Sequence, residues 1–301
     1  MQRIKISQSG PEFSRISLGL WRLAEWHMTS SRLTSFIEEN INLGITTFDH
    51  ADFYGNYTCE VLFGEGLAGK PSLRQKMEIV TKCGIKFPSD NRPENRFHGY
   101  DTSQEHIIRS AEKSLQTLRT DYIDVLLIHR PDPLMNADEI AEAFSKLKSV
   151  GKVLHFGVSN FLPHQFDLLQ SRLDFPLVTN QIEVSVLCTE PFYNGVLDQC
   201  QQLRISPMAW SPLAGGRIFT GNGEREQRVR GELIRVGEEL GGASPDQVAL
   251  AWLLKHPSSI IPVIGTSSVD RIKSAVAAMN LELSRDQWFR ILVASEGRPV
   301  A

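Results

Sequence analysis

The stretch IDVLLIHRPDPLMNADEIAEAFSKLKSVGKVLHFGVSN, residues 123–160, decides the fold. It begins with the apolar run Ile123–Ile128, which is typical of a buried strand. Asn136 and Glu139 then form a capping-box pattern, and an apolar stripe at helical spacing follows them. A second strand pattern, Val153–Val158, ends the unit. Strand, helix and strand in this order predict two parallel strands joined by a crossover helix.

The same alternation of short strand patterns and amphipathic helical patterns runs through the whole chain. Eight strand patterns occur, each followed by a helical segment. Eight such units make up a (β/α)8 TIM barrel, which takes about 250 residues. The predicted strands are Ile16–Leu20, Ile45–Phe48, Met77–Thr81, Ile123–Ile128, Val153–Val158, Leu177–Asn180, Ile205–Ala209 and Ile260–Ile264.

The remaining residues predict two additions to the barrel. Arg3–Ile6 and Phe13–Ile16 form the pattern of an N-terminal β-hairpin, and Ser284 begins an extra C-terminal helix. A doubly wound open sheet is the alternative fold. It would carry a glycine-rich phosphate loop after its first strand, whereas residues 18–22 read Leu-Gly-Leu-Trp-Arg. We therefore predict that residues 1–301 form a single (β/α)8 barrel domain.

Composition and charge argue against several classes of protein. The chain has 301 residues, of which 41% are hydrophobic and 22% charged, an ordinary composition for a globular protein. The net charge of −3 argues against a nucleic-acid or membrane-surface partner held by bulk charge. We expect no membrane span and no secretion signal, because no run is long and apolar enough. The four cysteines lack zinc-site spacing, so we expect no metal site and a cytoplasmic location.

Polar residues follow nearly all of the predicted strands. In a TIM barrel the chemistry lies at these C-terminal strand ends, because the loops there meet at one mouth. An isolated residue of this kind could be an ordinary loop residue, but the whole ring indicates a site. The end residues are Asp49 with the nearby Tyr54, Lys82, His129, Ser159-Asn160, Asn180-Gln181, Trp210-Ser211 and Gly265-Thr266-Ser267.

Four of these side chains form a chemically coherent set. Tyr54 is a weak acid, with an ordinary pKa of about 10, that could donate a proton if a neighbouring cation favoured the phenolate. Lys82 can be that cation, with Asp49 holding it charged and oriented. His129 can hydrogen-bond a carbonyl oxygen. Each residue also has a structural interpretation: Asp49 could cap a helix, Tyr54 could pack on the barrel rim, Lys82 could be solvated and His129 could be a core histidine.

Several stretches resemble the signatures of the aldo-keto reductase superfamily. The resemblance runs in register over about residues 14–295, and the closest likeness is to the bacterial YdhF-type oxidoreductases. The matching stretches are GITTFDHADFYGNYTCE (44–60), IVTKCG (79–84), DVLLIHRPD (124–132), GKVLHFGVSNF (151–161), NQIEVS (180–185) and residues 264–271.

The resemblance implies a (β/α)8 oxidoreductase that uses NADPH, without a Rossmann domain, to reduce aldehydes or ketones to alcohols. In that family the equivalents of Asp49, Tyr54, Lys82 and His129 form a catalytic tetrad. By this resemblance Tyr54 would be the general acid in carbonyl reduction. Lys82, paired with Asp49, would lower the pKa of Tyr54, and His129 would orient the carbonyl group.

The resemblance also implies an NADPH site, with the carboxamide, nicotinamide ring, pyrophosphate and 2′-phosphate bound in turn. The last of these groups is a dianion that a guanidinium suits well. Ser159, Asn160 and Gln181 would hold the carboxamide, Trp210 would stack on the ring, and Ser211 and Leu213 to Gly215 would lie along the pyrophosphate. Ser267 and Arg271 would contact the 2′-phosphate, and Gly265 and Thr266 of the last loop complete the implied cofactor site.

Two long loops, residues 83–102 and 211–228, are predicted to shape a substrate pocket. Long loops within compact proteins are usually functional lids or clamps. Core or rim packing is an equal alternative for each of the side chains that could line this pocket. The candidate lining residues are Trp21, Trp26, Phe87 and His98.

Two other functions fit the same residues. A Schiff-base lyase could use Lys82 as its nucleophile, although the neighbouring Asp49 would keep that amine protonated. A non-catalytic NADPH-binding module could sense redox state within a larger assembly. The leading expectation remains a reductase with a small-molecule carbonyl substrate. The sequence leaves open the physiological substrate, the favoured direction and the oligomeric state.

Overall fold

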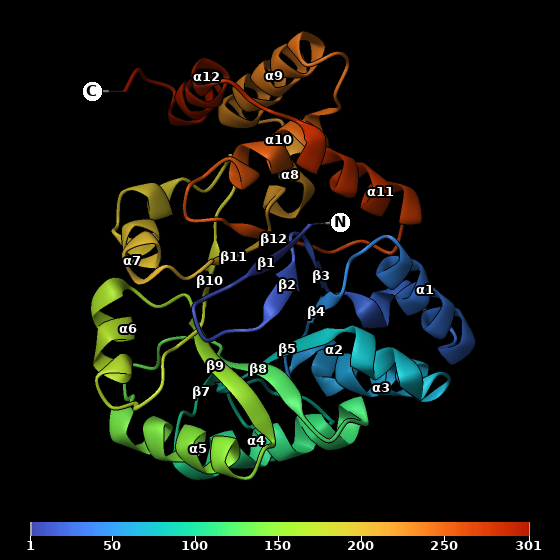
Figure 1. The fold of residues 1–301 in the computed structure, drawn as a ribbon, viewed down its shortest axis with the longest axis vertical. Helices are drawn as coiled ribbons and strands as arrows, with labels where there is room; N and C mark the ends of the chain where they lie inside the picture. Colours follow the sequence, from blue (N-terminus) through green and yellow to red (C-terminus); the bar gives the residue numbers. More distant parts are fainter. Residues whose placement is uncertain (1, 301) are drawn as a thin grey trace.

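The computed structural model, which describes residues 2–300, contains a closed barrel of parallel strands (Figure 1). The strands pair in the order β10-β11-β12-β3-β4-β5-β8-β9, so the predicted barrel is confirmed and the open sheet is excluded. The barrel strands are β3 (Ser17–Gly19), β4 (Thr47–Asp49), β5 (Glu78–Cys83), β8 (Ile123–Ile128), β9 (Val153–Ser159), β10 (Asn180–Glu183), β11 (Met208–Trp210) and β12 (Ile261–Ile264).

Helices surround the barrel and bury their apolar faces against the strands (Figure 1). Short 3-10 turns precede or follow several of them. The helices are α1 (Ser30–Asn42), α2 (Tyr54–Tyr57), α3 (Cys59–Ala68), α4 (Gln104–Leu118), α5 (Ala137–Ser149), α6 (Pro163–Gln170), α7 (Val196–Leu203), α8 (Arg217–Thr220), α9 (Glu224–Glu239), α10 (Pro245–Leu254), α11 (Val269–Ala277) and α12 (Arg285–Glu296). The 3-10 turns are η1 (Leu23–Trp26), η2 (Pro71–Lys76), η3 (Glu190–Phe192), η4 (Ala214–Gly216) and η5 (Ala278–Asn280).

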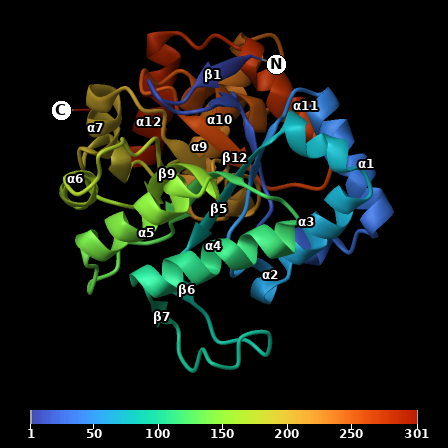
Figure 2. The same ribbon diagram turned by 60° about the horizontal axis from the view of Figure 1, so that its bottom comes forward.

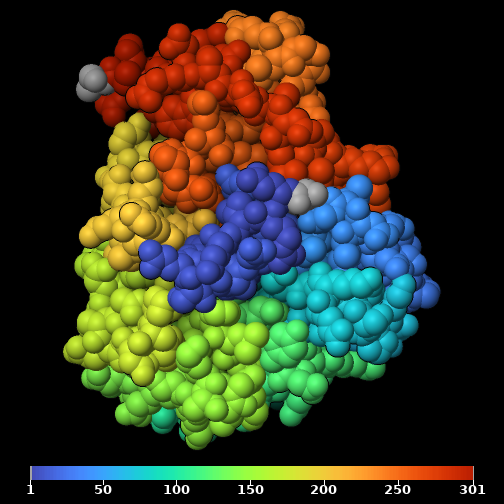
Figure 3. Space-filling model, in the orientation of Figure 1, coloured from blue at the N-terminus to red at the C-terminus, as the bar shows by residue number. Residues whose placement is uncertain are grey.

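The predicted N-terminal hairpin is present and covers one end of the barrel. Strands β1 (Arg3–Lys5) and β2 (Glu12–Ser14) pair antiparallel, and the hairpin lies across the middle of the face shown in Figure 3. Ile6 and Phe13 are fully buried and belong to an apolar cluster with residues of the barrel strands. This end of the barrel is therefore filled by side chains, which leaves the opposite end for a site.

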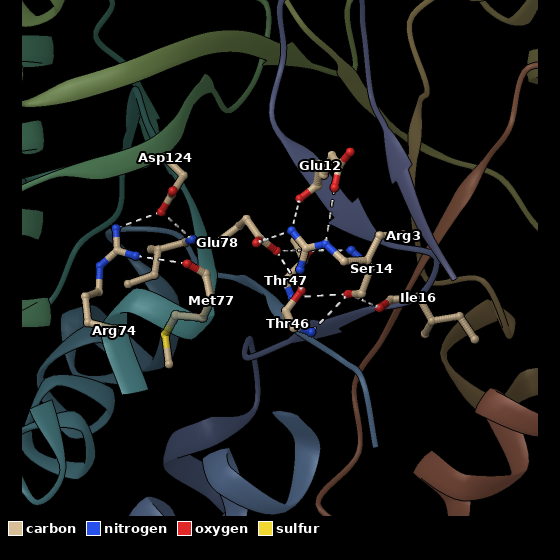
Figure 4. A network of polar contacts seen from close by, with 11 residues as sticks. Arg3, Glu12, Ser14, Ile16, Thr46, Thr47, Arg74, Met77, Glu78 and Asp124 are labelled. Carbon is tan, nitrogen blue, oxygen red and sulfur yellow. Dashed lines mark hydrogen bonds and ion pairs between the residues drawn. The ribbon is translucent and has the colours of Figure 1, made fainter. Parts of the chain in front are cut away.

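A polar network fastens the hairpin to the first residues of the strands (Figure 4). The guanidinium of Arg3 donates hydrogen bonds to Thr46 Oγ1 at 2.6 Å and to Glu78 Oε1 at 2.6 Å. Beside it, Arg74 donates to Asp124 Oδ2 at 2.7 Å. Thr46, Glu78 and Asp124 lie at or near the N-terminal ends of β4, β5 and β8, so the network holds the hairpin at this end of the barrel.

The predicted C-terminal helix is also present, and it packs on a helix that the sequence patterns did not predict. Ser284 caps α12 as predicted, through a capping box with Gln287. The indoles of Trp252 on α10 and Trp288 on α12 are stacked with ring centres 4.9 Å apart, and each Nε1 donates to the other residue's carbonyl oxygen at 3.0 Å. The unpredicted helix, α9, packs against both α10 and α12 on the outside of the barrel (Figure 1).

The interpretation of residues 211–228 as one long loop is wrong. This segment contains η4, α8 and the first turn of α9. Its glycines indicated a loop, and Gly215 and Gly216 do adopt left-handed φ angles of 63° and 93°. In residues 83–102, strands β6 (Ile85–Lys86) and β7 (Gly99–Tyr100) pair antiparallel, and the intervening loop projects from the barrel (Figure 2).

Candidate active site

Side chains from three neighbouring barrel strands meet at the open end of the barrel. Asp49 is the last residue of β4, Lys82 lies in β5, His129 directly follows β8, and Tyr54 is the first residue of α2. Lys82 Nζ donates to both carboxylate oxygens of Asp49 at 2.8 Å and to the His50 carbonyl oxygen at 2.6 Å. It also lies 3.2 Å from Tyr54 Oη. The structure thus brings all four tetrad candidates together.

Lys82 is fully buried, and its charge state follows from its partners. Burial would lower the pKa of the Lys82 ammonium, but the carboxylate of Asp49 and the Tyr54 hydroxyl raise it above the ordinary value. Lys82 is therefore held protonated at neutral pH. A protonated amine has no lone pair with which to attack a carbonyl carbon.

The pKa of Tyr54 departs from the expected direction. Burial raises it above the ordinary tyrosine value, and the ammonium of Lys82 lowers it only part of the way back. The contribution expected of Lys82 is present, but the net shift is upward because desolvation of the phenolate is the larger effect. Tyr54 is consequently a phenol with its proton in place throughout the neutral range.

His129 is buried, and its imidazole ring stays neutral. Its ring lies 5.8 Å from that of Tyr54, edge to face, and 5.2 Å from that of Phe53. Burial, together with the charges of Lys82 and Arg130, lowers the pKa of His129 well below its ordinary value. Within the described part of the chain, His129 Nδ1 is buried without a hydrogen-bond partner.

A chain of hydrogen bonds links the tetrad to the residues proposed for the nicotinamide. The side-chain Nε2 of Gln181 donates to Asp49 Oδ1 at 2.7 Å, and Ser159 Oγ donates to the main-chain carbonyl oxygen of Gln181 at 2.9 Å. Asn160 Nδ2 donates to Ser159 Oγ at 2.7 Å, and Trp210 Nε1 donates to Asn160 Oδ1 at 2.9 Å. This chain fixes the Trp210 indole relative to the Asp49 carboxylate.

The loops after β11 and β12 have an open backbone that fits a dinucleotide. Ser211, at φ 49°, precedes Leu213 and the left-handed glycines of η4. A Cβ atom built on Gly215 or Gly216 would meet nothing within 4 Å, so a ligand can approach this backbone closely. After β12, Gly265 is exposed and Thr266 and Ser267 are half-buried. Such backbone amides next to a helix start suit phosphate oxygens.

Arg271 is exposed in the first turn of α11, and its backbone amide donates to the capping hydroxyl of Ser268 at 3.4 Å. A guanidinium at the start of this nine-residue helix adds a full positive charge to the helix N-terminus. The phosphate-binding chemistry implied for the last loop is therefore available there.

The four candidate pocket residues have different surroundings in the structure. Phe87 lies 6.1 Å from Phe53 and 5.4 Å from the exposed His98, so these three rings continue the wall beside His129. Trp21 is 58% exposed. Trp26, by contrast, packs edge-on against Phe36 of α1 at 5.7 Å.

The sequence analysis did not single out Tyr57, which holds Phe87 in place. Tyr57 Oη accepts hydrogen bonds from the Phe87 amide at 2.9 Å and from Asn95 Nδ2 at 3.0 Å. Tyr57 adopts a left-handed φ of 66°, which is unusual for an aromatic residue. It thereby ties the loop between β6 and β7 to the turn that carries Tyr54.

Comparison with known proteins agrees with this arrangement. The model of the aldo/keto reductase family matches residues 15–295. The chain belongs to the aldo/keto reductase family. Within residues 2–300, no helix is both long and apolar enough to cross a membrane, and no cluster of three or more metal-binding side chains is found.

Several known proteins resemble the chain over nearly its full length. It is 54% identical to the uncharacterised oxidoreductase YcsN of Bacillus subtilis, covering 99% of both chains. It is 54% identical to the oxidoreductase YdhF of Escherichia coli, covering 100% of this chain and 99% of that one. A 6-dehydroglucose reductase of Agrobacterium fabrum is 46% identical over 100% of both chains. A solved structure, the thermostable aldo-keto reductase Tm1743, shares the fold, with a TM-score of 0.83 at 24% identity over 98% of this chain and 100% of that one.

Proposed function

We propose that this protein is an NADPH-dependent reductase that converts aldehydes or ketones to alcohols. One observation carries the proposal: a protonated Lys82, held by Asp49, lies 3.2 Å from the hydroxyl of Tyr54, with the neutral ring of His129 beside it. This set places a proton donor and a hydrogen-bonding imidazole next to each other at the open end of the barrel. Membership of the aldo/keto reductase family supports carbonyl reduction in general.

When bound, NADPH would supply the hydride, and hence the two electrons, that the carbonyl carbon needs. Tyr54 donates its hydroxyl proton to the carbonyl oxygen, which becomes the hydroxyl group of the alcohol. The ammonium of Lys82 stabilises the phenolate that remains until a solvent proton replaces the one donated. His129 hydrogen-bonds the carbonyl oxygen and so orients the group toward Tyr54.

The proposed cofactor residues lie in or just after β9, β10 and β11, and in the loop and first helical turn after β12. Ser159, Asn160 and Gln181 would hold the carboxamide, and Trp210 would support the nicotinamide ring. The open backbone from Ser211 to Gly215 would take the pyrophosphate. Gly265, Thr266, Ser267 and Arg271 would surround the adenosine 2′-phosphate.

The same geometry weighs against the Schiff-base alternative. Asp49 and Tyr54 keep Lys82 protonated, so the amine is a poor nucleophile. A panel of aldehydes, ketones and oxidised sugars, assayed at 340 nm with NADPH and NADH in parallel, tests the proposal; the 6-dehydroglucose reductase relative motivates the sugars. Consumption of NADPH with an equal yield of alcohol supports it. Tight cofactor binding without turnover of any compound would instead support a non-catalytic redox-sensing module.

Replacing Arg271 by alanine is expected to raise the KM for NADPH about ten-fold or more and to change that for NADH much less. A charge-assisted hydrogen bond to the 2′-phosphate contributes roughly 1.5–3 kcal/mol, and NADH lacks that phosphate. Steady-state kinetics with both cofactors measure the effect. Lys273→Ala is the matched control, because Lys273 is a cation of the same helix paired with Asp270 at 3.7 Å. Equal losses for both cofactors in Arg271→Ala would contradict a 2′-phosphate contact.

The rate of carbonyl reduction is expected to be flat with pH across the neutral range. The raised pKa of Tyr54 keeps the acid protonated, so kcat/KM falls only as the pH rises past the ordinary tyrosine pKa of about 10. The lowered pKa of His129 keeps the imidazole neutral, so no change is expected near its ordinary pKa of about 6.5. A profile of kcat/KM measures both. If kcat/KM changed with a midpoint between about pH 7 and 8, these pKa shifts of Tyr54 and His129 would be contradicted.

A further inference from the structure

Arg130 is a cation beside the tetrad to which the proposed reaction assigns no role. It directly follows His129 and is half-buried. Its guanidinium carbon lies 5.4 Å from the centre of the Trp210 ring, so the charge sits over the indole expected to support the nicotinamide. Among residues 2–300 its side chain has no hydrogen bond or ion pair of its own.

The charge of Arg130 acts on the groups around it. It adds to the burial that lowers the pKa of His129, and it partly offsets the burial that raises the pKa of Tyr54. Glu183 at the end of β10 is an acid that feels this charge; burial raises the pKa of Glu183, while Arg217 and Arg130 lower it. Glu183 forms no ion pair with either arginine in the described chain, and Arg217 already lies 3.7 Å from Glu226.

The half-buried guanidinium of Arg130 has no ionic partner among the described residues, so an anionic ligand could bind it without displacing a carboxylate of the protein. A carboxylate fits best, because the planar guanidinium binds its two oxygens through two parallel hydrogen bonds. The aromatic rings of Phe53, 5.2 Å from that of His129, and of Phe87, 6.1 Å from that of Phe53, suit an apolar body that joins the carbonyl group to the carboxylate.

We propose that Arg130 selects carbonyl substrates that carry a carboxylate group. The inference rests on the proposed reductase function and names the substrate class of that site. A substrate is a better occupant than the cofactor, because Arg130 adjoins His129 just after β8, whereas the open backbone suited to phosphates follows β11 and β12. Arg130 then neutralises the carboxylate as the carbonyl group meets Tyr54 and His129.

The test compares matched aromatic aldehydes that differ only in charge. The probes are 3- and 4-carboxybenzaldehyde with 3- and 4-methylbenzaldehyde, assayed with NADPH on the wild type, Arg130→Met and Arg130→Lys. We expect the wild type to favour the carboxylated member of at least one pair by about ten-fold or more in kcat/KM. Arg130→Met, which keeps a long apolar stem over Trp210, should abolish this preference, and Arg130→Lys should retain much of it. A wild type without the preference, or Arg130→Met with it, overturns the proposal.

Two further measurements distinguish Arg130 from the neighbouring cation and the substrate from the cofactor. Arg217→Met removes the neighbouring cation and should leave the preference in place; its loss there would assign the carboxylate to Arg217 and overturn the proposal. Calorimetric titration of the same four compounds reads binding without turnover. If none of the four aldehydes is reduced, the wider carbonyl panel decides the reductase function, and the titration still decides whether Arg130 favours a carboxylate. A loss of NADPH affinity in Arg130→Met with no change in the preference would assign Arg130 to the cofactor instead.

Discussion

Replacing Tyr54 by phenylalanine is expected to lower the turnover of a carbonyl substrate by about a hundred-fold or more while NADPH still binds. The change removes only the hydroxyl that lies 3.2 Å from Lys82 Nζ. The remaining ring keeps its packing, with Phe53 at 5.4 Å and His129 at 5.8 Å, so the fold and the cofactor loops should be unaffected. Turnover measured at 340 nm and a fluorescence titration with NADPH give the two quantities.

Tyr122→Phe is the matched control for this variant. Tyr122 lies just before β8, at the closed end of the barrel, with Arg74 over its ring at 3.9 Å. Loss of its hydroxyl should leave turnover close to that of the wild type. Full activity in Tyr54→Phe would remove the proposed acid, whereas equal losses in both variants would indicate a general effect of losing a tyrosine hydroxyl.

Replacing Lys82 by methionine is expected to abolish turnover and to lower the free energy of unfolding by about 3–5 kcal/mol. The variant leaves the buried Asp49 carboxylate with Gln181 but without its cation. Removing one member of a buried ion pair is strongly destabilising, because the remaining charge is desolvated without a counter-charge. Urea denaturation measures the stability, and the carbonyl assay measures the activity.

The double variant Asp49→Asn with Lys82→Met separates the two effects. It removes both charges, so most of the lost stability should return, while turnover should stay abolished because no ammonium stabilises the Tyr54 phenolate. A single variant as stable as the wild type would contradict the energetic importance of the pair. A double variant with normal turnover would contradict the role of Lys82 in the reaction.

The barrel could be predicted because its signal lies in local apolar runs, yet those runs misplaced several strand ends. Lys82, predicted to follow its strand, lies within β5, and Gln181, predicted at a strand end, lies within β10. Barrel strands continue to pair through polar residues, as in the register of Gln181 with Ser159 and with Met208. Apolar content therefore marks the middle of a strand better than its last residue.

Helix α9 was not predicted because it has few apolar residues, and these pack against another helix that lies far away in the sequence. Val229, Leu233 and Val236 are its buried apolar residues, within a segment that is otherwise strongly charged. They pack in a cluster that includes Ile291 and Leu292 of α12, about sixty residues later in the chain. Neither periodicity nor composition in a short window indicates such a distant partner.

The four tetrad residues could be predicted from the sequence because they were expected at the ends of successive strands. The pKa shifts in the site could not be predicted in this way. The net rise in the pKa of Tyr54 depends on how deeply the phenol is buried, which the spacing between Asp49 and Lys82 does not determine. The environment of Arg130 could not be predicted either. The sequence shows that Arg130 follows His129, but only the structure shows that β10 and β11 supply no counter-ion for it.

A crystal structure with NADP+ bound tests the central claim most directly. The account predicts the nicotinamide ring against Trp210, with its C4 atom beside Tyr54 Oη and His129, and the 2′-phosphate next to Arg271. A nicotinamide bound away from the open end of the barrel, or a Tyr54 hydroxyl turned away from C4, would contradict it.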